Sequence, residues 1–479
     1  MSLSEPGDRL GERRACRATI ALAGSPPHCW RISVGANADR KFRQRDAVCQ
    51  LPLLLDASAG ETMRMGPSLM LPILARGNAE PAPDSRQLAG EELARALRDS
   101  RRHTLSYIED LTDAQWQVPH QAGINPVAWE LAHLAWFAEF WTLRGPTRVG
   151  TDGFVHADQP PRLAGSDALF DSARLVHADR WRVSLPSREQ VLNMLDAQLE
   201  TCVRSLPTGD SDEELYFQRL ALFHEDMHGE AFAWMRAALG YATPMGLALK
   251  HQVASEPLRV PGGAVRVGWP PACSGFAFDN ELPGLSQNLP TFEIDAQPVS
   301  AGQFLCFVEA GGYDEPTYWQ GDAGTWRRAS ELRHPARWQK QKLCSGSQWE
   351  TRWFDHWVVL DPDQPVIHVN AFEAEAYCKW AGRRLPTATE WEYAALLEGG
   401  QRFAWGNGVW EWTSEAFEPY PGFIPGPYKD YSAPWFGNHR ELRGGAFATH
   451  ARMHDARYRN FFMPHRADIF AGFRTASMS

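Results

Sequence analysis

The chain has 479 residues, 44% of them hydrophobic and 11% aromatic, so it is long enough to bury substantial cores in two or three domains. A formal net charge of -10 leaves no basic footprint for nucleic acid or an anionic membrane surface, and favours small-molecule partners. The eight cysteines include no C-x-x-C pair, and no apolar run approaches the roughly 20 residues of a spanning helix, so we expect a cytoplasmic protein.

Residues 1–85 form the first segment and are rich in Arg, Pro, Gly and Ala. Apolar pieces such as "LPLLLDA" are too short and irregular to found a domain. We expect this segment to be disordered, or an extension upstream of the natural start, for which Met63, Met65 and Met70 offer alternatives.

Residues 86–245 have apolar side chains at three- and four-residue intervals, which predicts four long helices and hence a helical bundle. The second helix has Asn125 as its expected cap and Pro126 in its first turn. Ser187 and Gln190 form a capping box, and Gly240 ends the fourth helix. The expected helices are residues 86–111, 125–143, 187–206 and 211–239.

The stretch "HEDMHGEAF" in the fourth helix predicts a metal site. His224 and His228 are four residues apart and therefore share one helix face, and His133 in the second helix supplies a third imidazole. Glu230 lies off that face, so its chemical role would be to accept the other N–H of a ligand imidazole. The alternatives are a solvated Glu230 and histidines that are satisfied core residues.

From about residue 250 the pattern changes to short strand-like runs with many Gly and Pro residues and most of the tryptophans. We therefore expect a loop-rich α+β domain over residues 250–479, with the boundary at residues 245–256. The predicted fold class is a four-helix bundle followed by this α+β domain.

The second domain contains, in this order, the motifs "VPGGAVRVG", "VNAFEAEAYCKWAGRRLPTATEWEYAA", "GNGVWEWTS", "LRGGAF" and "AGFR". In this order they resemble the formylglycine-generating-enzyme (sulfatase-modifying factor) fold, which has C-type-lectin-like architecture. Formylglycine-generating enzymes place two copper-binding cysteines after the R-G-G motif, where this chain has Thr449 and His454. Formylglycine formation is therefore not expected.

The front half, with H-x-x-x-H-x-E and "NPVAWELAHLAWFAEFW", resembles a DinB-like bundle. The pair of domains resembles the non-haem iron sulfoxide synthases of ergothioneine and ovothiol biosynthesis and the related selenoneine synthases. The resemblance implies that His133, His224 and His228 hold Fe(2+). It also implies that O₂ and hercynine, the trimethylated betaine of histidine, are substrates.

The same resemblance implies that the second domain holds the betaine. Asn460 and Phe461 are the candidates for its carboxylate and ammonium, in the segment "RYRNFFMPHRADIFAGFR". Trp412 and Tyr420 are candidate aromatic walls, because a quaternary ammonium is attracted to aromatic faces. Trp410, in the same "VWEW" run, has the alternative of being a core residue.

The donor of sulfur or selenium is the remaining question. Family members that use γ-glutamylcysteine resemble one another in N-W-D-x-x-x-R; here "NFFMPHR" keeps Arg466 but has Phe462 at the acid. Phe417 stands where that type has a tyrosine near the iron, and Met227 replaces a glutamine. Arg182 and Arg466 are expected to lie near the donor. Loss of the acid favours a selenosugar over the alternatives, cysteine or γ-glutamylcysteine.

A hypothesis of another class is a zinc enzyme. Three histidines also suit Zn²⁺. The protein would then resemble DinB-like thiol transferases and hydrolases, and its second domain would serve only to bind the substrate. Metal content and oxygen consumption distinguish the two classes.

Overall fold

The computed structural model describes residues 84–253, 255–270, 273–344, 346–398, 402–406 and 408–478. All of them fall in the compact unit Ser68–Ser479. Of the extension expected over residues 1–85, only the last two residues are described, so that prediction lies outside the described residues.

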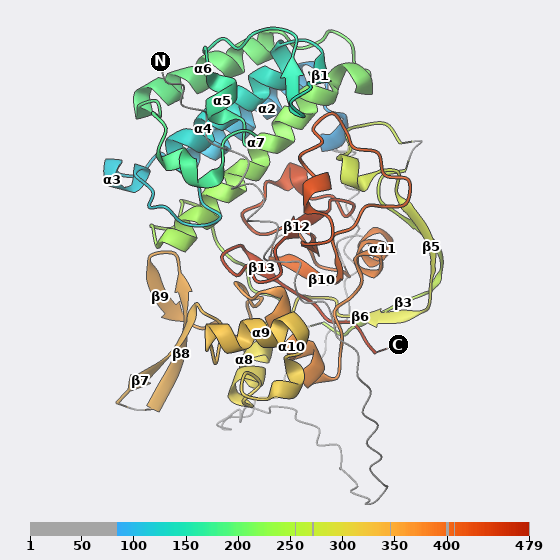
Figure 1. The fold of residues 1–479 in the computed structure, drawn as a ribbon. Coiled ribbons are helices and arrows are strands. Elements are labelled where there is room, and N and C mark those ends of the chain that lie inside the picture. Colours follow the sequence, from blue (N-terminus) through green and yellow to red (C-terminus); the bar gives the residue numbers. More distant parts are fainter. Residues whose placement is uncertain are drawn as a thin grey trace, which may run out of the picture. The chain divides into compact units, whose positions relative to one another are not determined.

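The first part is a bundle of four long helices, as predicted (Figure 1). The second long helix packs against the third and the fourth, and the first packs against the fourth. The long helices are α2 (Gly90–Ser106), α4 (Val127–Leu143), α6 (Arg188–Arg204) and α7 (Asp212–Leu239). The shorter elements are η1 (Ser85–Gln87), α3 (Asp113–Trp116), β1 (Thr147–Val149), β2 (Val155–Ala157), α5 (Ser166–Phe170) and η2 (His177–Trp181).

The predicted start of α6 and both predicted ends of α7 are confirmed, whereas α6 ends at Arg204, two residues before the predicted end. Ser187 and Gln190 form the reciprocal capping box, and Ser211 accepts a hydrogen bond from the backbone of Glu214. Gly240 ends α7 in the left-handed conformation, with φ +67°. Glycine adopts this conformation without the steric cost that a Cβ brings.

Two predicted helix starts are wrong. The first helix was expected from residue 86, but η1 and the extended Ala89 precede α2, because Arg86 turns away to pair with Glu281 of the second domain. Asn125 does not cap α4: Pro126 occupies the cap position without a side-chain bond, and the Asn125 amide donates to Glu130 instead.

The second part is the predicted α+β domain, built from small sheets and short helices (Figure 1). The sheet that positions the site has the order β12-β11-β10-β13, with β10 (Trp410–Ala416), β11 (Arg440–Arg443), β12 (Asn460–Phe462) and β13 (Ala471–Gly472). The other strands form the pairs β3 (Leu258–Val260) with β6 (Phe292–Ile294) and β4 (Gly263–Val267) with β5 (Leu285–Leu289), and the meander β7 (Trp338–Leu343), β8 (Gly346–Trp353) and β9 (His356–Val359).

The helices of this part are short, and two of them begin at capping boxes, formed by Ser300 with Gln303 and by Asn370 with Glu373. They are α8 (Ala301–Glu309), α9 (Gly321–Ser330), α10 (Ala371–Ala381) and α11 (Ala388–Glu398), with the single turns η3 (Asp279–Glu281), η4 (Pro316–Tyr318), η5 (Ala433–Trp435) and η6 (Ala451–Met453). Within the described ranges, no helix is both long enough and apolar enough to span a bilayer.

One buried core runs through both parts of the molecule. It joins Trp129 and Phe137 of α4 and Phe223 of α7 to Phe278 and Trp410 of the second domain. The bundle and the α+β domain therefore pack on each other as one body, and side chains from both can meet at one site.

Candidate metal centre

The structure brings the three predicted histidines together. His133 projects from α4 and His224 and His228 project from α7, with ligand nitrogens all within 4.8 Å of one another. The Nε2 atoms of His133 and His224 are 3.3 Å apart. That separation fits two nitrogens that each lie about 2.1 Å from a single ion.

The rings of His133 and His224 are fixed by their surroundings. His133 directs Nδ1 at the carbonyl oxygen of Phe170, 2.7 Å away, and stacks on Trp129. The ring of His224 stacks on Phe137 with centroids 3.5 Å apart. Burial lowers the pKa of both histidines well below the ordinary value, so both are neutral imidazoles, the form that binds metal.

The carboxylate behind a ligand imidazole is Glu130, and the prediction that Glu230 fills this role is wrong. Glu130 is 4% exposed, and its Oε1 lies 2.7 Å from Nδ1 of His228. Its other oxygen accepts from Asn125 at 3.1 Å. Glu130 is three residues before His133 on α4, and this i, i+3 spacing places both on the side of α4 that faces α7.

Glu230 points at the second domain instead, because two helical positions turn its side chain about 200° away from His228. One carboxylate oxygen accepts from the indole N–H of Trp410 and the other from the hydroxyl of Thr449, each at 2.6 Å. Burial raises the pKa of Glu230 to about 7. Trp410 is thus a buried contact between the domains.

The arginine beside the metal centre is Arg180, which sequence reasoning missed. Its guanidinium lies 3.8 Å from the ring centroid of Trp129 and donates to Asn125 at 2.6 Å. Burial lowers the pKa of Arg180. The predicted Arg182 has a side chain 76% exposed and pairs with Asp179, so it does not line the centre.

On the second domain, Asn460, Phe461 and Phe462 form the edge strand β12. The side-chain oxygen of Asn460 accepts from the backbone N–H of Phe461. The ring of Phe461 stacks on Phe417, with centroids 4.2 Å apart, and contacts Tyr431 edge-on. Phe417 is fully buried and serves as the floor under Phe461.

Two predicted aromatic walls lie inside the second domain. Trp412 is fully buried and donates its indole N–H to the carbonyl of Val369. Tyr420 accepts from Arg443, and the guanidinium of Arg459 covers its ring at 4.1 Å. Their faces are therefore occupied by protein, and the prediction that they surround an ammonium group is wrong.

Three tyrosines that the sequence did not single out lie near the histidines. The ring of Tyr428 packs against Phe137 at 5.0 Å and against His224 at 6.2 Å between centroids. Tyr458 donates to the sulfur of Met227, 3.2 Å away, and the hydroxyls of Tyr431 and Tyr458 are 3.1 Å apart. The sequence signal for Tyr428 and Tyr431 was the pair of tyrosines in "GPYKDYS", and Tyr458 lies in the segment "RYRNFFMPHRADIFAGFR".

Arg466 is neutralised within its own loop. It makes two hydrogen bonds to Asp468, at 2.5 and 2.6 Å. Its guanidinium lies 5.2 Å from the ring centroids of both Phe462 and Trp234. Gly123 approaches the same guanidinium so closely that a Cβ there would lie 3.3 Å from it.

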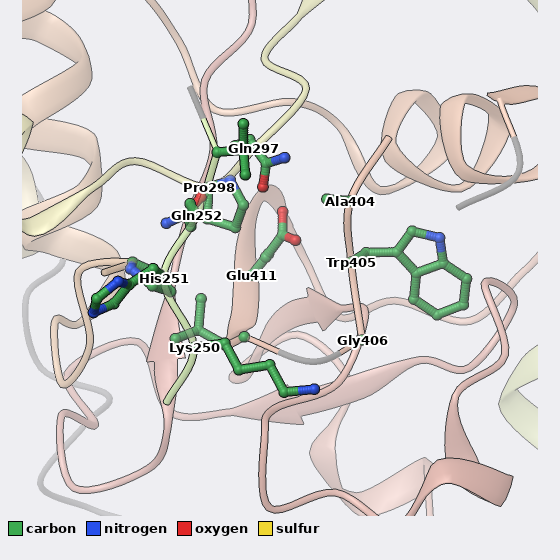
Figure 2. A pocket seen from close by; sticks show the side chains of 13 residues that line it. Lys250, His251, Gln252, Gln297, Pro298, Ala404, Trp405, Gly406 and Glu411 are labelled. Carbon is green, nitrogen blue, oxygen red and sulfur yellow. The ribbon is translucent and has the colours of Figure 1, made fainter. Parts of the chain in front are cut away.

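Two pockets deserve comparison. A small cavity beside His133 is lined by five aromatic residues, two acids and three small or aliphatic residues. They are Trp136, Phe137, Phe140, Trp141 and Tyr428, then Asp171 and Asp430, then Val155, Ser172 and Ala173. A more open pocket of the second domain, shown in Figure 2, includes Lys250, His251, Gln297, Trp405 and Glu411 and contains none of the three histidines. Its one carboxylate, Glu411, is held by Arg474 and Trp391.

Comparison with known proteins gives two family matches. Residues 96–235 match the DinB superfamily, and residues 247–409 and 406–478 match the sulfatase-modifying factor enzyme 1-like domain, which confirms the predicted pairing of domains. A hercynine oxygenase of Mycolicibacterium smegmatis is 31% identical over 81% of this chain and 99% of that protein. A hercynine oxygenase of Mycolicibacterium thermoresistibile is 32% identical over 80% and 94%. A formylglycine-generating enzyme of Streptomyces coelicolor is 27% identical over 44% and 84%.

Proposed function

The chain belongs to the hercynine oxygenase family, and from this premise we propose that it is a non-haem Fe(2+) enzyme that uses O₂ to join a chalcogen donor to the imidazole C2 of hercynine. The single observation that carries the proposal is the set of three histidines with Glu130 behind one of them. Neutral imidazoles suit Fe(2+), and three protein ligands leave coordination positions for O₂ and a soft donor atom. When bound, the iron would supply the oxidation that an unactivated imidazole C–H requires.

The residues of the chain orient and shield this centre. Glu130 accepts the Nδ1 proton of His228, and the carbonyl of Phe170 accepts that of His133, so both rings offer Nε2 to the metal. Phe137 and Tyr428 cover the centre with aromatic surface. This wall would exclude water from the reacting atoms.

We place hercynine between the histidines and β12. The Oδ1 of Asn460 is occupied by the Phe461 N–H, so the group that Asn460 offers to the betaine carboxylate is its Nδ2 amide. Because Trp412 and Tyr420 lie in the domain interior, the aromatic faces proposed for the trimethylammonium are Phe461 and Tyr431.

We propose a selenosugar as the donor. Phe462 stands where an acid would meet an amino-acid ammonium, and its ring lies against Arg466, whose charge Asp468 already balances. A neutral polyhydroxylated donor needs hydrogen bonds and no ion pair. Binding an amino-acid donor would instead bury an ammonium group without a carboxylate partner, which costs several kcal/mol. Arg182 is exposed and Arg466 is paired with Asp468, so we propose that Arg180 contacts the donor. Among the described residues, no carboxylate lies within ion-pair distance of Arg180, which donates to Asn125 and lies over Trp129.

Product analysis tests this proposal against its alternatives. The Fe(2+)-loaded protein receives hercynine, O₂ and an equimolar mixture of a selenosugar, cysteine and γ-glutamylcysteine, and mass spectrometry identifies the adducts. We expect the selenium adduct to dominate. A dominant cysteine or γ-glutamylcysteine sulfoxide would make the protein a sulfoxide synthase. Retained zinc with no oxygen consumption would favour the DinB-like transferase or hydrolase.

A further inference from the structure

Helix α7 carries two pairs of functional side chains at i, i+4 spacing. His224 and His228 form one pair, and Asp226 and Glu230 form the other. Two residues correspond to about 200° of helix rotation, so the carboxylates project from the side opposite the histidines. Whatever holds the two carboxylates therefore sets the rotation and axial position of the two histidines.

A loop of the second domain, residues 446–454 (the clamp loop), holds Glu230. The Thr449 hydroxyl donates to Glu230 at 2.6 Å and accepts from the backbone N–H of Ala446 at 2.8 Å. The Trp410 indole donates to the other oxygen of Glu230 at 2.6 Å. Both acceptors of the carboxylate are thus used by groups from outside the bundle.

The same loop holds Asp226 one turn earlier on α7. Arg452 lies 3.3 Å from one oxygen of Asp226 and also binds Asp99 and the backbone carbonyl of Ala96 on α2. Ser100 of α2 donates to Asp226 at 2.7 Å. Asp226 is 1% exposed, so its position is determined by these partners.

We propose that the clamp loop is a positioning device for the metal centre, in which Thr449 and Arg452 fix α7 so that His224 and His228 face His133. A third contact supports this role, because Tyr458, four residues beyond the loop, donates to Met227 between the two ligands. The chain continues from Tyr458 directly into β12, which places the loop between the proposed hercynine strand and the metal-bearing helix.

The inference rests on the metal centre of the proposed function, and on neither hercynine nor the donor. The test therefore uses Co²⁺ alone, whose visible absorption reports ligand geometry, bound to the full chain. Thr449→Val removes the hydroxyl at nearly constant volume, and Thr449→Ser restores it. We expect Thr449→Val to change the Co²⁺ absorption band and to weaken Co²⁺ binding by about 3- to 10-fold, below the 10–100-fold typical of direct ligand partners. Thr449→Ser should match the wild type.

Asp110→Asn provides the matched control. Asp110 pairs with Arg236 near the C-terminal end of α7, but within the bundle. It should lower the unfolding temperature and leave the Co²⁺ spectrum unchanged. If Thr449→Val does not fold, Glu230→Gln gives the same readout, since it keeps the volume and one acceptor.

A Thr449→Val or Glu230→Gln protein with the wild-type spectrum and Co²⁺ affinity would overturn the inference and reduce the loop to a structural contact. Failure of the wild type itself to bind Co²⁺ would instead refute the metal centre on which the proposed function depends. The two failures are therefore distinguishable.

Discussion

Removing the Glu130 carboxylate should weaken metal binding more than any other change outside the three ligands. In Glu130→Ala, His228 loses an acceptor 2.7 Å from Nδ1, and the Asn125 amide loses its acceptor at 3.1 Å. Carboxylate partners of ligand histidines typically contribute about 10- to 100-fold in metal affinity. That range corresponds to about 1.4–2.7 kcal/mol. Glu130→Gln should lie near the lower limit, because the amide oxygen still accepts the Nδ1 proton.

The assay is an anaerobic titration of the Fe(2+)-loaded protein with a competing chelator, repeated with Co²⁺ to separate affinity from oxidation. The reasoning also predicts an order, since Glu130→Ala should lose more affinity than Glu230→Gln. Metal retention within twofold of wild type in Glu130→Ala, or a larger loss in Glu230→Gln, would refute the assignment of Glu130 as the partner of His228.

Four further substitutions test the ligands, the substrate residues and a buried acid. His228→Ala should abolish iron retention, because two imidazoles cannot hold the ion, and full metal content would remove His228 from the site. Asn460→Ala should raise the hercynine KM at a cost of about 1–3 kcal/mol for the lost hydrogen bond, and unchanged kinetics would place the betaine elsewhere. Phe462→Asp should improve turnover of cysteine and γ-glutamylcysteine relative to a selenosugar, which competition assays measure. Burial raises the pKa of Glu373 from 4.5 to about 7, so its stabilising contribution is complete below about pH 4.5 and is lost as the pH rises through 7. As the pH rises from 4.5 to 8, the unfolding free energy of Glu373→Gln should therefore increase by about 3 kcal/mol relative to that of the wild type. Urea unfolding midpoints that change equally with pH in the two proteins would contradict this.

Helix periodicity was sufficient to predict that two of the candidate metal ligands share one helix face. His224 and His228 share a face by spacing alone, and the structure places His133 opposite them. The same rule could have found Glu130, which precedes His133 by three residues and so lies on its face. The prediction chose Glu230, two residues beyond His228 on α7, although that acid points to the opposite side of the helix.

Residues outside regular elements were harder to place. Arg180 and Arg182 are two residues apart at the end of a 3-10 turn, and a charge pattern does not tell which guanidinium turns inward. Trp412 and Tyr420 illustrate the same limit for aromatic rings. The ring of Tyr420 is covered by Arg459, but its local sequence would look the same if the ring faced a substrate. The two cases differ only in the group that packs on the ring in the folded protein.

The shared core explains why the candidate metal centre and the proposed substrate strand β12 depend on each other. The bundle supplies all three imidazoles, but Phe223 of α7 packs on Phe276 and Phe278 of the second domain. An isolated bundle would expose that aromatic surface and leave Asp226 and Glu230 without the partners they have on the clamp loop. Without those partners nothing from the second domain would fix the rotation of α7, so the helix would be free to rotate or fray at this face. Since the same rotation moves His224 and His228, the geometry of the centre is a property of the two domains together.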